Sequence, residues 1–289
     1  MELDAATGRR PGAEERAAEA RLAGYAGTLV LRVGYRGADF CGFAEQPGLR
    51  TVAGELGRAV STLLRRPVEI TCAGRTDAGV HALAQYVSIP VTQQELSLSG
   101  HTMLSALNAL TPDNMSVSRV YRAPEGFSAR FDALSRSYRY RIFPGPARPV
   151  LCAGHAWWMR HALDVGAMDE AARLLVGERD FKSFCKAASA EGKSTVREVL
   201  SCGVSCVEEA GERLVAVDVV GSAFLHSMVR TIAGTLVEVG RGHHDPTWVR
   251  DVLGACDRRA AGPCAPANGL TFVDVSYPEG LLVTWEDDC

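Results

Sequence analysis

The 289-residue sequence predicts an α+β fold with largely antiparallel sheet. Segments with the alternation of β-strands are interleaved with amphipathic helical segments, and no regular strand-helix-strand period recurs. Both halves of the chain show a similar order of elements, which suggests a duplicated unit. The proline- and glycine-rich stretch at 143–149 suggests a linker between them. We therefore expect a disordered or short-helical tail at 1–26, an N-terminal α/β domain at 27–142 and a C-terminal α/β domain at 143–289.

The first half begins with a short helix at 13–22 of the tail and continues with regular elements. Thr51 has the side chain of a helix N-cap, and Val52, Leu56 and Val60 recur on one helical face behind it. We predict strands at 28–35, 68–72, 83–90 and 115–121, and helices at 51–64 and 102–110.

The first half ends with the stretch 135–143 (SRSYRYRIF), a predicted strand with one aromatic face and one basic face. Tyr138 and Tyr140 fall on the first face, and Arg139 and Arg141 fall on the second. In the second half, strands are predicted at 195–206, 214–221 and 269–277, and helices from the cap Asp164 to before Gly177, at 224–239 and at 245–256. His226 and Arg230, four residues apart, would share a face of the helix at 224–239.

The composition is that of an ordinary soluble globular protein, with 47% apolar and 22% charged residues. No apolar stretch is long enough to span a membrane, and the N-terminal segment lacks the apolar region of a secretory signal. Nine cysteines without a CxxC pair suggest reduced thiols, so we expect a cytoplasmic protein. The cluster His243, His244, Cys256 and Cys264 fits no zinc-finger spacing, and we predict no metal site.

Basic residues are concentrated in one part of the chain. Residues 119–148 carry a local charge of +5, although the whole chain has a net charge of -3. Such a stripe favours a groove that binds a polyanion, but from charge alone a solvated face is an equally good interpretation. The charges are Arg119, Arg122, Arg130, Arg136, Arg139, Arg141 and Arg148, against Glu125 and Asp132.

The stretch AGRTDAGVHA at 73–82 places charged residues between two glycines, directly before a strand. It has the span of a phosphate-binding loop, but Val80 and His81 stand where the lysine and the hydroxyl residue of that loop would be. Arg75 beside Asp77 would favour the ionised carboxylate, which can act as a nucleophile or a base. The alternative is a salt bridge that only stabilises the turn.

This stretch resembles the signature of the tRNA pseudouridine synthases of the A type. Three later stretches resemble further blocks of that family in the same order: FSARFDALSRSYRY at 127–140, GSAFLHSMVRTIAGTLVEVGRG at 221–242 and NGLTFVDVSYP at 268–278. The resemblance runs from about Leu29 to Pro278. It implies the pseudouridine synthase fold, with two similar α/β halves and mostly antiparallel sheets around a central basic cleft.

The resemblance also implies a function and a set of site residues. The implied activity is that of an isomerase, which converts uridine to pseudouridine at positions 38, 39 and 40 of the tRNA anticodon stem-loop. The implied partners are tRNA and a second copy of the chain in a homodimer. Asp77 would be the nucleophile of the catalytic domain at 27–142, Tyr138 would contact the flipped uracil, Arg230 would pair with Asp77, and Leu270 would line the base pocket. We expect Arg75, Arg130, Arg139 and Arg141 to contact the RNA.

The reaction that the resemblance implies needs no metal or organic cofactor, because it involves no redox change and adds no group. Two positions depart from the family pattern: Arg36 replaces an acidic residue and Phe43 replaces a tryptophan. We expect these changes to affect RNA docking rather than the fold. Two alternatives remain, an RNA-binding protein of the same fold without activity, and a hydrolase that uses Asp77 on a small substrate.

Overall fold

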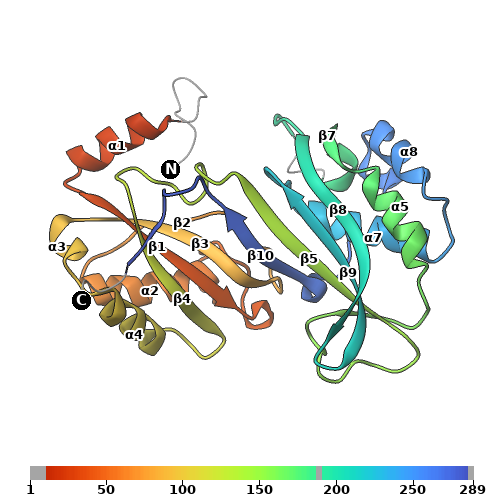
Figure 1. The fold of residues 1–289 in the computed structure, drawn as a ribbon, viewed down its shortest axis with the longest axis horizontal. Helices are drawn as coiled ribbons and strands as arrows, with labels where there is room; N and C mark the ends of the chain where they lie inside the picture. Colours follow the sequence, from red (N-terminus) through yellow and green to blue (C-terminus); the bar gives the residue numbers. More distant parts are fainter. Residues whose placement is uncertain (1–10, 187–190, 286–289) are drawn as a thin grey trace.

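The computed structural model describes residues 11–186 and 191–285, and within them eleven strands form one sheet. The order across the sheet is β11-β4-β1-β3-β10-β5-β9-β8-β7, with β2 beside β3 and β6 beside β5. Figure 1 labels these strands except β6 and β11. The strands are β1 (Gly27–Tyr35), β2 (Thr71–Cys72), β3 (His81–Val91), β4 (Met115–Ala123), β5 (Ser135–Pro144), β6 (Trp157–Met159), β7 (Gly177–Asp180), β8 (Val196–Glu209), β9 (Glu212–Gly221), β10 (Leu270–Ser276) and β11 (Val283–Thr284).

Most neighbouring strands are antiparallel, and the parallel pairs in the described residues are β10 with β3 and β5 with β6. The predicted α+β class with mostly antiparallel sheet is confirmed. The strands form one continuous sheet, however, rather than a separate sheet in each half. The predicted strand at 68–72 is also shorter than expected, because only Thr71 and Cys72 pair with β3.

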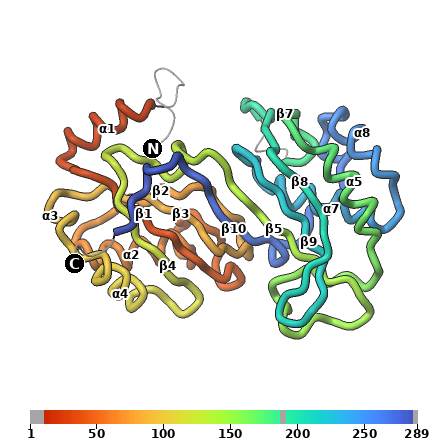
Figure 2. Tube along the Cα trace, in the orientation of Figure 1, coloured from red at the N-terminus to blue at the C-terminus, as the bar shows by residue number. Residues whose placement is uncertain are grey.

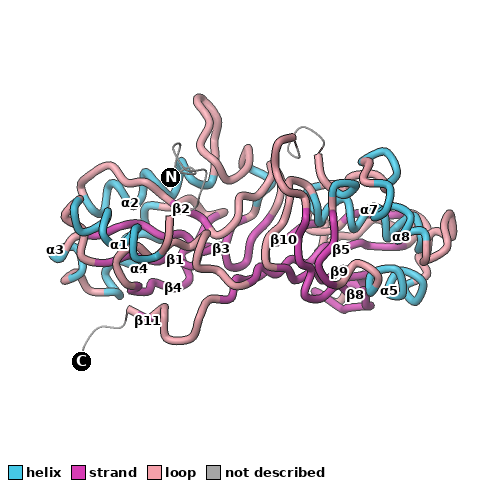
Figure 3. The backbone as a smooth tube through the Cα atoms, turned by 90° about the horizontal axis from the view of Figure 1, so that it is seen from above, coloured by secondary structure: helices cyan, strands magenta, loops and turns pink. Residues whose placement is uncertain are grey.

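Helices accompany both halves of the sheet. The helices are α1 (Ala13–Leu22), α2 (Val52–Leu64), α3 (Gln93–Leu96), α4 (Gly100–Leu110), α5 (Val165–Arg173), α7 (Met228–Gly240) and α8 (Trp248–Ala255), with 3-10 turns at Gly37–Asp39, Lys182–Phe184, Arg258–Ala260 and Ala267–Gly269. The predicted N-caps are confirmed for two of them, since Thr51 accepts from the Gly54 amide and Asp164 accepts from the Ala167 amide. Seen from above, α2 and α7 lie on the same side of the strand layer (Figure 3).

Two helices begin later than the sequence predicted. Ser227 has a left-handed backbone, with φ of 60°, so α7 begins at Met228 rather than at residue 224. His226 therefore lies before the helix and does not share a helical face with Arg230. Asp245 holds the turn before α8 by accepting from the Thr247 amide and hydroxyl, and that helix begins at Trp248.

The last part of the chain connects the two halves. Strand β10 lies between β3 and β5, as the trace in Figure 2 also shows, and β11 pairs with β4 at the far edge. The strand β5 runs into the predicted linker at 143–149 and pairs with β9 on its other side. The sheet therefore continues through the expected domain boundary, and residues 270–284 complete the part of it formed by β1 to β4.

Strand β5 has the predicted alternation. Arg136, Tyr138, Tyr140 and Ile142 are buried on one face, and the intervening side chains are partly exposed on the other. The burial of Arg136 is an exception to the predicted basic stripe. Among the described residues, no helix combines the length and the apolar character needed to cross a membrane.

Candidate active site

The turn at 73–80 joins β2 to β3 and is held from both sides. The Thr76 hydroxyl shares a hydrogen bond of 2.8 Å with the Tyr35 hydroxyl, and the Thr76 carbonyl accepts from the Phe43 amide at 3.0 Å. The neighbouring segment approaches so closely that a β-carbon at Gly37 would lie 2.0 Å from the Val80 carbonyl oxygen. Only glycine fits there. The backbone around Asp77 is therefore fixed by packing as well as by hydrogen bonds.

Asp77 is surrounded by three polar side chains from the start of α7 and the residues just before it. Arg230 Nη1 lies 2.9 Å from Oδ2 of Asp77, and the Ser227 hydroxyl donates to the same oxygen at 3.2 Å. His226 Nε2 lies 3.4 Å from Oδ1. Asp77 is 29% exposed and Arg230 is 19% exposed, so the pair lies at the surface of the core rather than in bulk solvent. One carboxylate oxygen is thus well occupied, and the other is more open.

Arg230 is itself braced. Its Nε donates to the Ala265 carbonyl at 2.8 Å, and the Ala265 amide donates back to the Arg230 carbonyl at 3.1 Å. The Asp77 pairing implied by the resemblance is present in the structure. Arg75, by contrast, is exposed, and the cation beside Asp77 is Arg230 instead. The expected ion pair between Arg75 and Asp77 is therefore wrong. The positive charge beside Asp77 comes instead from Arg230, which is distant in the sequence.

Tyr138 lies next to this turn in a cluster of aromatic rings. A β-carbon at Gly74 would be 3.5 Å from the Tyr138 hydroxyl, so the phenol reaches the start of the turn. Phe272 and Phe224 pack against the tyrosine edge to face, with ring centroids at 4.9 and 5.0 Å. Tyr138 is only 9% exposed, and this burial raises the pKa of its hydroxyl well above the ordinary value. The hydroxyl is therefore neutral at physiological pH.

Leu270 lies on β10 directly opposite Tyr140 of β5 and is buried. The Tyr140 hydroxyl donates to the Pro266 carbonyl at 2.8 Å, which satisfies the polar end of a ring that is otherwise in the core. Tyr140 is thus a packing residue, whereas Tyr138 reaches the turn that carries Asp77.

The predicted RNA-contacting arginines fall into two groups. Arg75 and Arg130 are exposed, and both lie near Cys72 of β2. Burial raises the pKa of the Cys72 thiol to about 11, and the positive charges of the two nearby arginines oppose that rise. Arg139 and Arg141 lie on the other face of β5. Arg139 binds Asp218 at 2.7 and 3.0 Å, and Arg141 binds Glu209 at 2.6 Å.

Residues 119–148 therefore do not form a single basic surface. The charges of Arg139 and Arg141 are compensated by acidic residues on neighbouring strands, and Arg136 is buried. The structure brings together Asp77, Arg230 and Tyr138, and it places Arg75 and Arg130 at exposed positions near them. It does not bring Arg139 and Arg141 to this site.

Sequence reasoning missed Ser227 and the role of Arg136. Nothing in the local sequence indicates the left-handed turn that brings Ser227 to Asp77. Arg136 donates to the Ala73 carbonyl at 3.2 Å and to the Ser222 carbonyl at 2.6 Å, and so it links the start of the Asp77 turn to the segment that leads into α7. Its position on the aromatic face of β5 was the available signal.

The two departures from the family pattern occupy different environments. Phe43 is buried in the core beside the Asp77 turn, and Arg36 is exposed. His243 binds Glu238, whereas His244 stacks on Trp248, so both histidines of the cluster His243, His244, Cys256 and Cys264 have partners other than a metal. In the described part of the chain, no three histidine, cysteine or acidic side chains are grouped as a metal site.

Comparison with known proteins places this arrangement in a family. A family model described as tRNA pseudouridine synthase matches residues 171–278. The tRNA pseudouridine synthase A of Tolumonas auensis is 40% identical over 250 residues, which are 86% of this chain and 93% of that protein. The enzyme of the same name from Pseudomonas aeruginosa is 41% identical over 91% of this chain and 89% of that protein.

The chain belongs to the tRNA pseudouridine synthase A family. The resemblance inferred from the sequence is confirmed, and with it the pseudouridine synthase fold. Pseudouridine synthases are isomerases. Among solved structures, a chain in a crystal structure of a Cbf5-Nop10-Gar1 complex aligns with 79% of this chain and 49% of its own length, at 13% identity and a TM-score of 0.31.

Proposed function

We propose that this tRNA pseudouridine synthase isomerises uridine to pseudouridine at positions 38, 39 and 40 of the tRNA anticodon stem-loop, with Asp77 as the nucleophile. The proposal depends mainly on the Asp77 carboxylate, which is oriented by Arg230 and Ser227 beside the neutral hydroxyl of Tyr138. No observation favours the inactive alternative, because the carboxylate and its partners are all present. The hydrolase alternative is not supported either, since the relatives are named as synthases of pseudouridine in tRNA.

The two oxygens of Asp77 have different roles in this proposal. Oδ2 accepts hydrogen bonds from Arg230 and Ser227, which stabilise its negative charge and fix its direction. Oδ1 has only the longer contact with His226 Nε2, at 3.4 Å. It is therefore the oxygen available for attack. It adds either to C6 of the uracil or to C1′ of the ribose. In both routes the bond from N1 to C1′ breaks, the ring turns, and a bond from C5 to C1′ forms. The bond to Asp77 then breaks and restores the carboxylate, C5 loses its hydrogen as a proton to solvent, and N1 gains a proton.

Tyr138 serves as a neutral group in this scheme. Its raised pKa makes the phenolate scarce near neutral pH, so the tyrosine is unsuited to remove the C5 proton itself. Phe224 and Phe272 cover much of its ring, which leaves the hydroxyl end to meet the base. We assign Tyr138 to holding the extruded uracil, and Leu270 to the apolar lining of the same pocket.

A uridine inside a stem must leave the base stack to reach Asp77, which costs a few kcal/mol. Contacts between arginines and phosphates can hold the opened strand during that step. Arg75 and Arg130 are suited to this role because they are exposed and close to the turn. The proposed RNA contacts therefore centre on these two residues rather than on Arg139 and Arg141.

We also propose a cytoplasmic homodimer. Val150 and Leu151, between β5 and β6, are exposed apolar side chains of the kind that an interface between subunits buries. The eight cysteines in the described residues are free, as in proteins of a reducing compartment. Light scattering during size-exclusion chromatography tests the dimer, and a monomer mass at micromolar protein would contradict it.

Mapping of the modified positions tests the proposed substrate. Unmodified tRNA transcripts with uridines in the anticodon arm are incubated with the protein, labelled with a carbodiimide that marks pseudouridine, and read by reverse transcription. We expect stops only at positions 38, 39 and 40. Stops in another arm of the tRNA would contradict the proposed site, and the absence of stops would contradict the proposed activity.

A further inference from the structure

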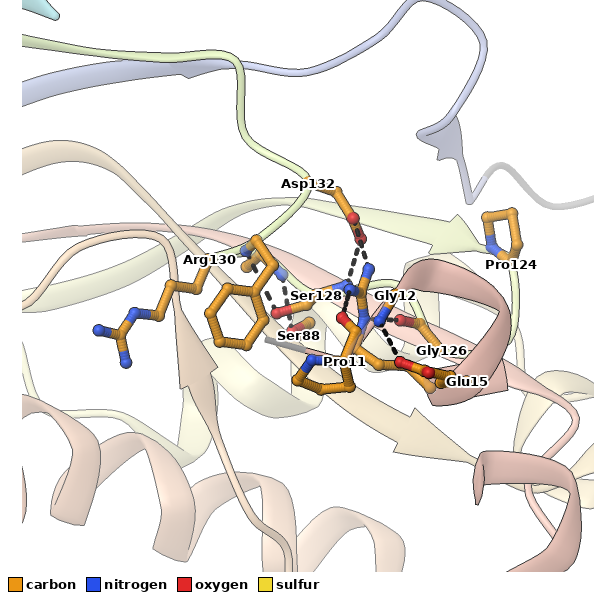
Figure 4. Close-up of polar contacts among 12 residues, drawn as sticks. Pro11, Gly12, Glu15, Ser88, Pro124, Gly126, Ser128, Arg130 and Asp132 are labelled. Carbon is orange, nitrogen blue, oxygen red and sulfur yellow. Dashed lines mark hydrogen bonds and ion pairs between the residues drawn. The ribbon is translucent and has the colours of Figure 1, made fainter. Parts of the chain in front are cut away.

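Helix α1 packs onto the segment at 124–132, as the close-up of this region shows (Figure 4). Its sequence, AEERAAEARL, offers little apolar surface, and an isolated helix of this length is marginal in water. Tertiary contacts must therefore hold it in place. The family motifs begin after this helix, so their pattern does not explain why it is there.

The helix rests directly on Gly126. This glycine has φ of +72°, and a β-carbon at the position would lie 2.3 Å from the backbone nitrogen of Ala17. No other residue would allow the helix to approach the segment so closely. The backbone of α1 thus packs directly against the backbone at Gly126, and this close packing fixes the position of the helix.

Arg16 fastens the helix to the same segment. It is only 6% exposed, and it donates to Asp132 Oδ1 at 2.5 Å and to the Gly126 carbonyl at 2.8 Å. The second oxygen of Asp132 accepts from the Ser128 amide at 2.8 Å, so this carboxylate connects α1 to the middle of the segment. A partly buried pair with two further hydrogen bonds is much stronger than an exposed one.

The segment held by α1 carries Arg130. The Arg130 carbonyl accepts from Arg136, which also donates to the Ala73 carbonyl at the start of the Asp77 turn. In Figure 4 the Arg130 side chain extends away from the polar cluster. Its backbone is therefore fixed from both sides. Its guanidinium is exposed and lies 5.5 Å from the centre of the Phe131 ring, a contact that does not neutralise its charge. Only the α1 side of this support lies outside the family motifs.

We propose that α1 is a positioning element of the RNA-binding site, and that Arg16 acts through the segment 124–132 to present Arg130 to a phosphate of the bound tRNA. This inference rests on the proposed function. It gives helix α1 a role in substrate affinity, and it makes Arg16 a positioning residue that touches no substrate.

A double-mutant cycle in the full-length protein tests the coupling. The tRNA dissociation constant is measured over a range of salt concentrations for Arg16→Met, Arg130→Met and the double variant. We expect each single change to raise Kd about three- to tenfold and to lower the salt slope by about one. The double variant should bind no worse than Arg130→Met alone, because Arg16 contributes only through Arg130.

Arg21→Met is the matched control. Arg21 lies on the same helix and binds Glu125 of the same segment at 2.9 Å, but it is 61% exposed. We expect its loss to leave Kd unchanged. Arg16→Lys should recover part of the affinity, and Asp132→Asn should reproduce the effect of Arg16→Met from the other side of the ion pair. All variants are compared at a temperature at which thermal unfolding shows them to be folded.

Two results would overturn the inference. The first is an unchanged Kd in Arg16→Met with only a lower melting temperature, and the second is a double variant in which the two effects simply add. Either would mean that α1 stabilises the fold without positioning Arg130. Pseudouridine formation is measured on the same preparations. A wild-type protein that binds tRNA without forming pseudouridine would contradict the proposed function, and the cycle would still decide the role of α1.

Discussion

Arg230 lies 2.9 Å from Asp77, although 153 residues separate them in the chain. The contact exists because β10 joins the two halves of the sheet, which brings the start of α7 to the turn between β2 and β3. The carboxylate proposed as the nucleophile is thus paired with an arginine from the other half of the sheet's fold, at the start of α7.

Removal of Arg230 should impair catalysis more than binding. Arg230→Met deletes the charge beside Asp77 and the brace to the Ala265 carbonyl, and we expect turnover to fall on the order of a hundredfold. Arg230→Lys keeps the charge but loses the planar fork, and its turnover should be intermediate. Single-turnover rates at saturating tRNA measure this. Arg241→Met, an exposed arginine beyond the other end of α7, is the control. Equal rates for Arg230→Met and this control would refute the role.

The salt dependence of tRNA binding should separate the two groups of arginines. Loss of both Arg75 and Arg130 should lower the salt slope by about two, because each is expected to contact a phosphate. Arg139→Met should leave the slope unchanged, since its charge is compensated by Asp218. Binding is measured at four or more salt concentrations. A slope that depends on Arg139 and not on Arg75 or Arg130 would place the RNA on the other face of β5.

Tyr138→Phe tests the neutral hydroxyl. The variant keeps the ring and should bind tRNA within a few-fold, but we expect turnover to fall by roughly a hundredfold because the hydroxyl no longer holds the base in position. Burial raises the pKa of Tyr138, so its ionisation should not appear in the rate profile between roughly pH 6 and pH 9. An alkaline limb in the wild-type profile that disappears in the variant would show that the phenolate takes part after all.

His81 should make the stability of the fold sensitive to acid. Burial and the nearby His155 lower the pKa of His81 to about 4, and its neutral ring accepts from the Gly37 amide. The unfolded chain binds this proton near pH 6.5, so the stabilisation is complete above that pH and is lost as pH falls toward 4. We expect the free energy of unfolding, measured with urea, to fall on the order of 1–2 kcal/mol from pH 7.5 to pH 5. His81→Gln should reduce this loss, and an identical loss in both proteins would contradict the assignment.

Much of the fold was predictable because it depends on local signals. The alternation of β5 and the caps Thr51 and Asp164 follow from short sequence patterns, and the structure confirms them. Asp77 was selected as the candidate nucleophile because its turn resembles a family signature. In each case the information lies within a few neighbouring residues.

The rest depends on contacts between distant residues. The partners of Arg139 and Arg141 are on β9 and β8, and their identity follows from strand register, which a single sequence does not reveal. The left-handed backbone of Ser227 shortens a helix whose apolar pattern continues past its real start. The sequence groups Arg136 with the other cations of residues 119–148. In the structure its guanidinium donates to backbone carbonyls inside the fold instead of to solvent.

Release of tritium from C5-labelled uridine in tRNA tests the central claim most directly, because substitution at C5 must expel that hydrogen. We predict that the wild-type protein releases one tritium for each pseudouridine formed. Asp77→Asn, which is nearly isosteric, should lower the release on the order of a thousandfold or more while tRNA binding stays within a few-fold. Release by Asp77→Asn at a rate close to that of the wild type would contradict the assignment of Asp77 as the nucleophile.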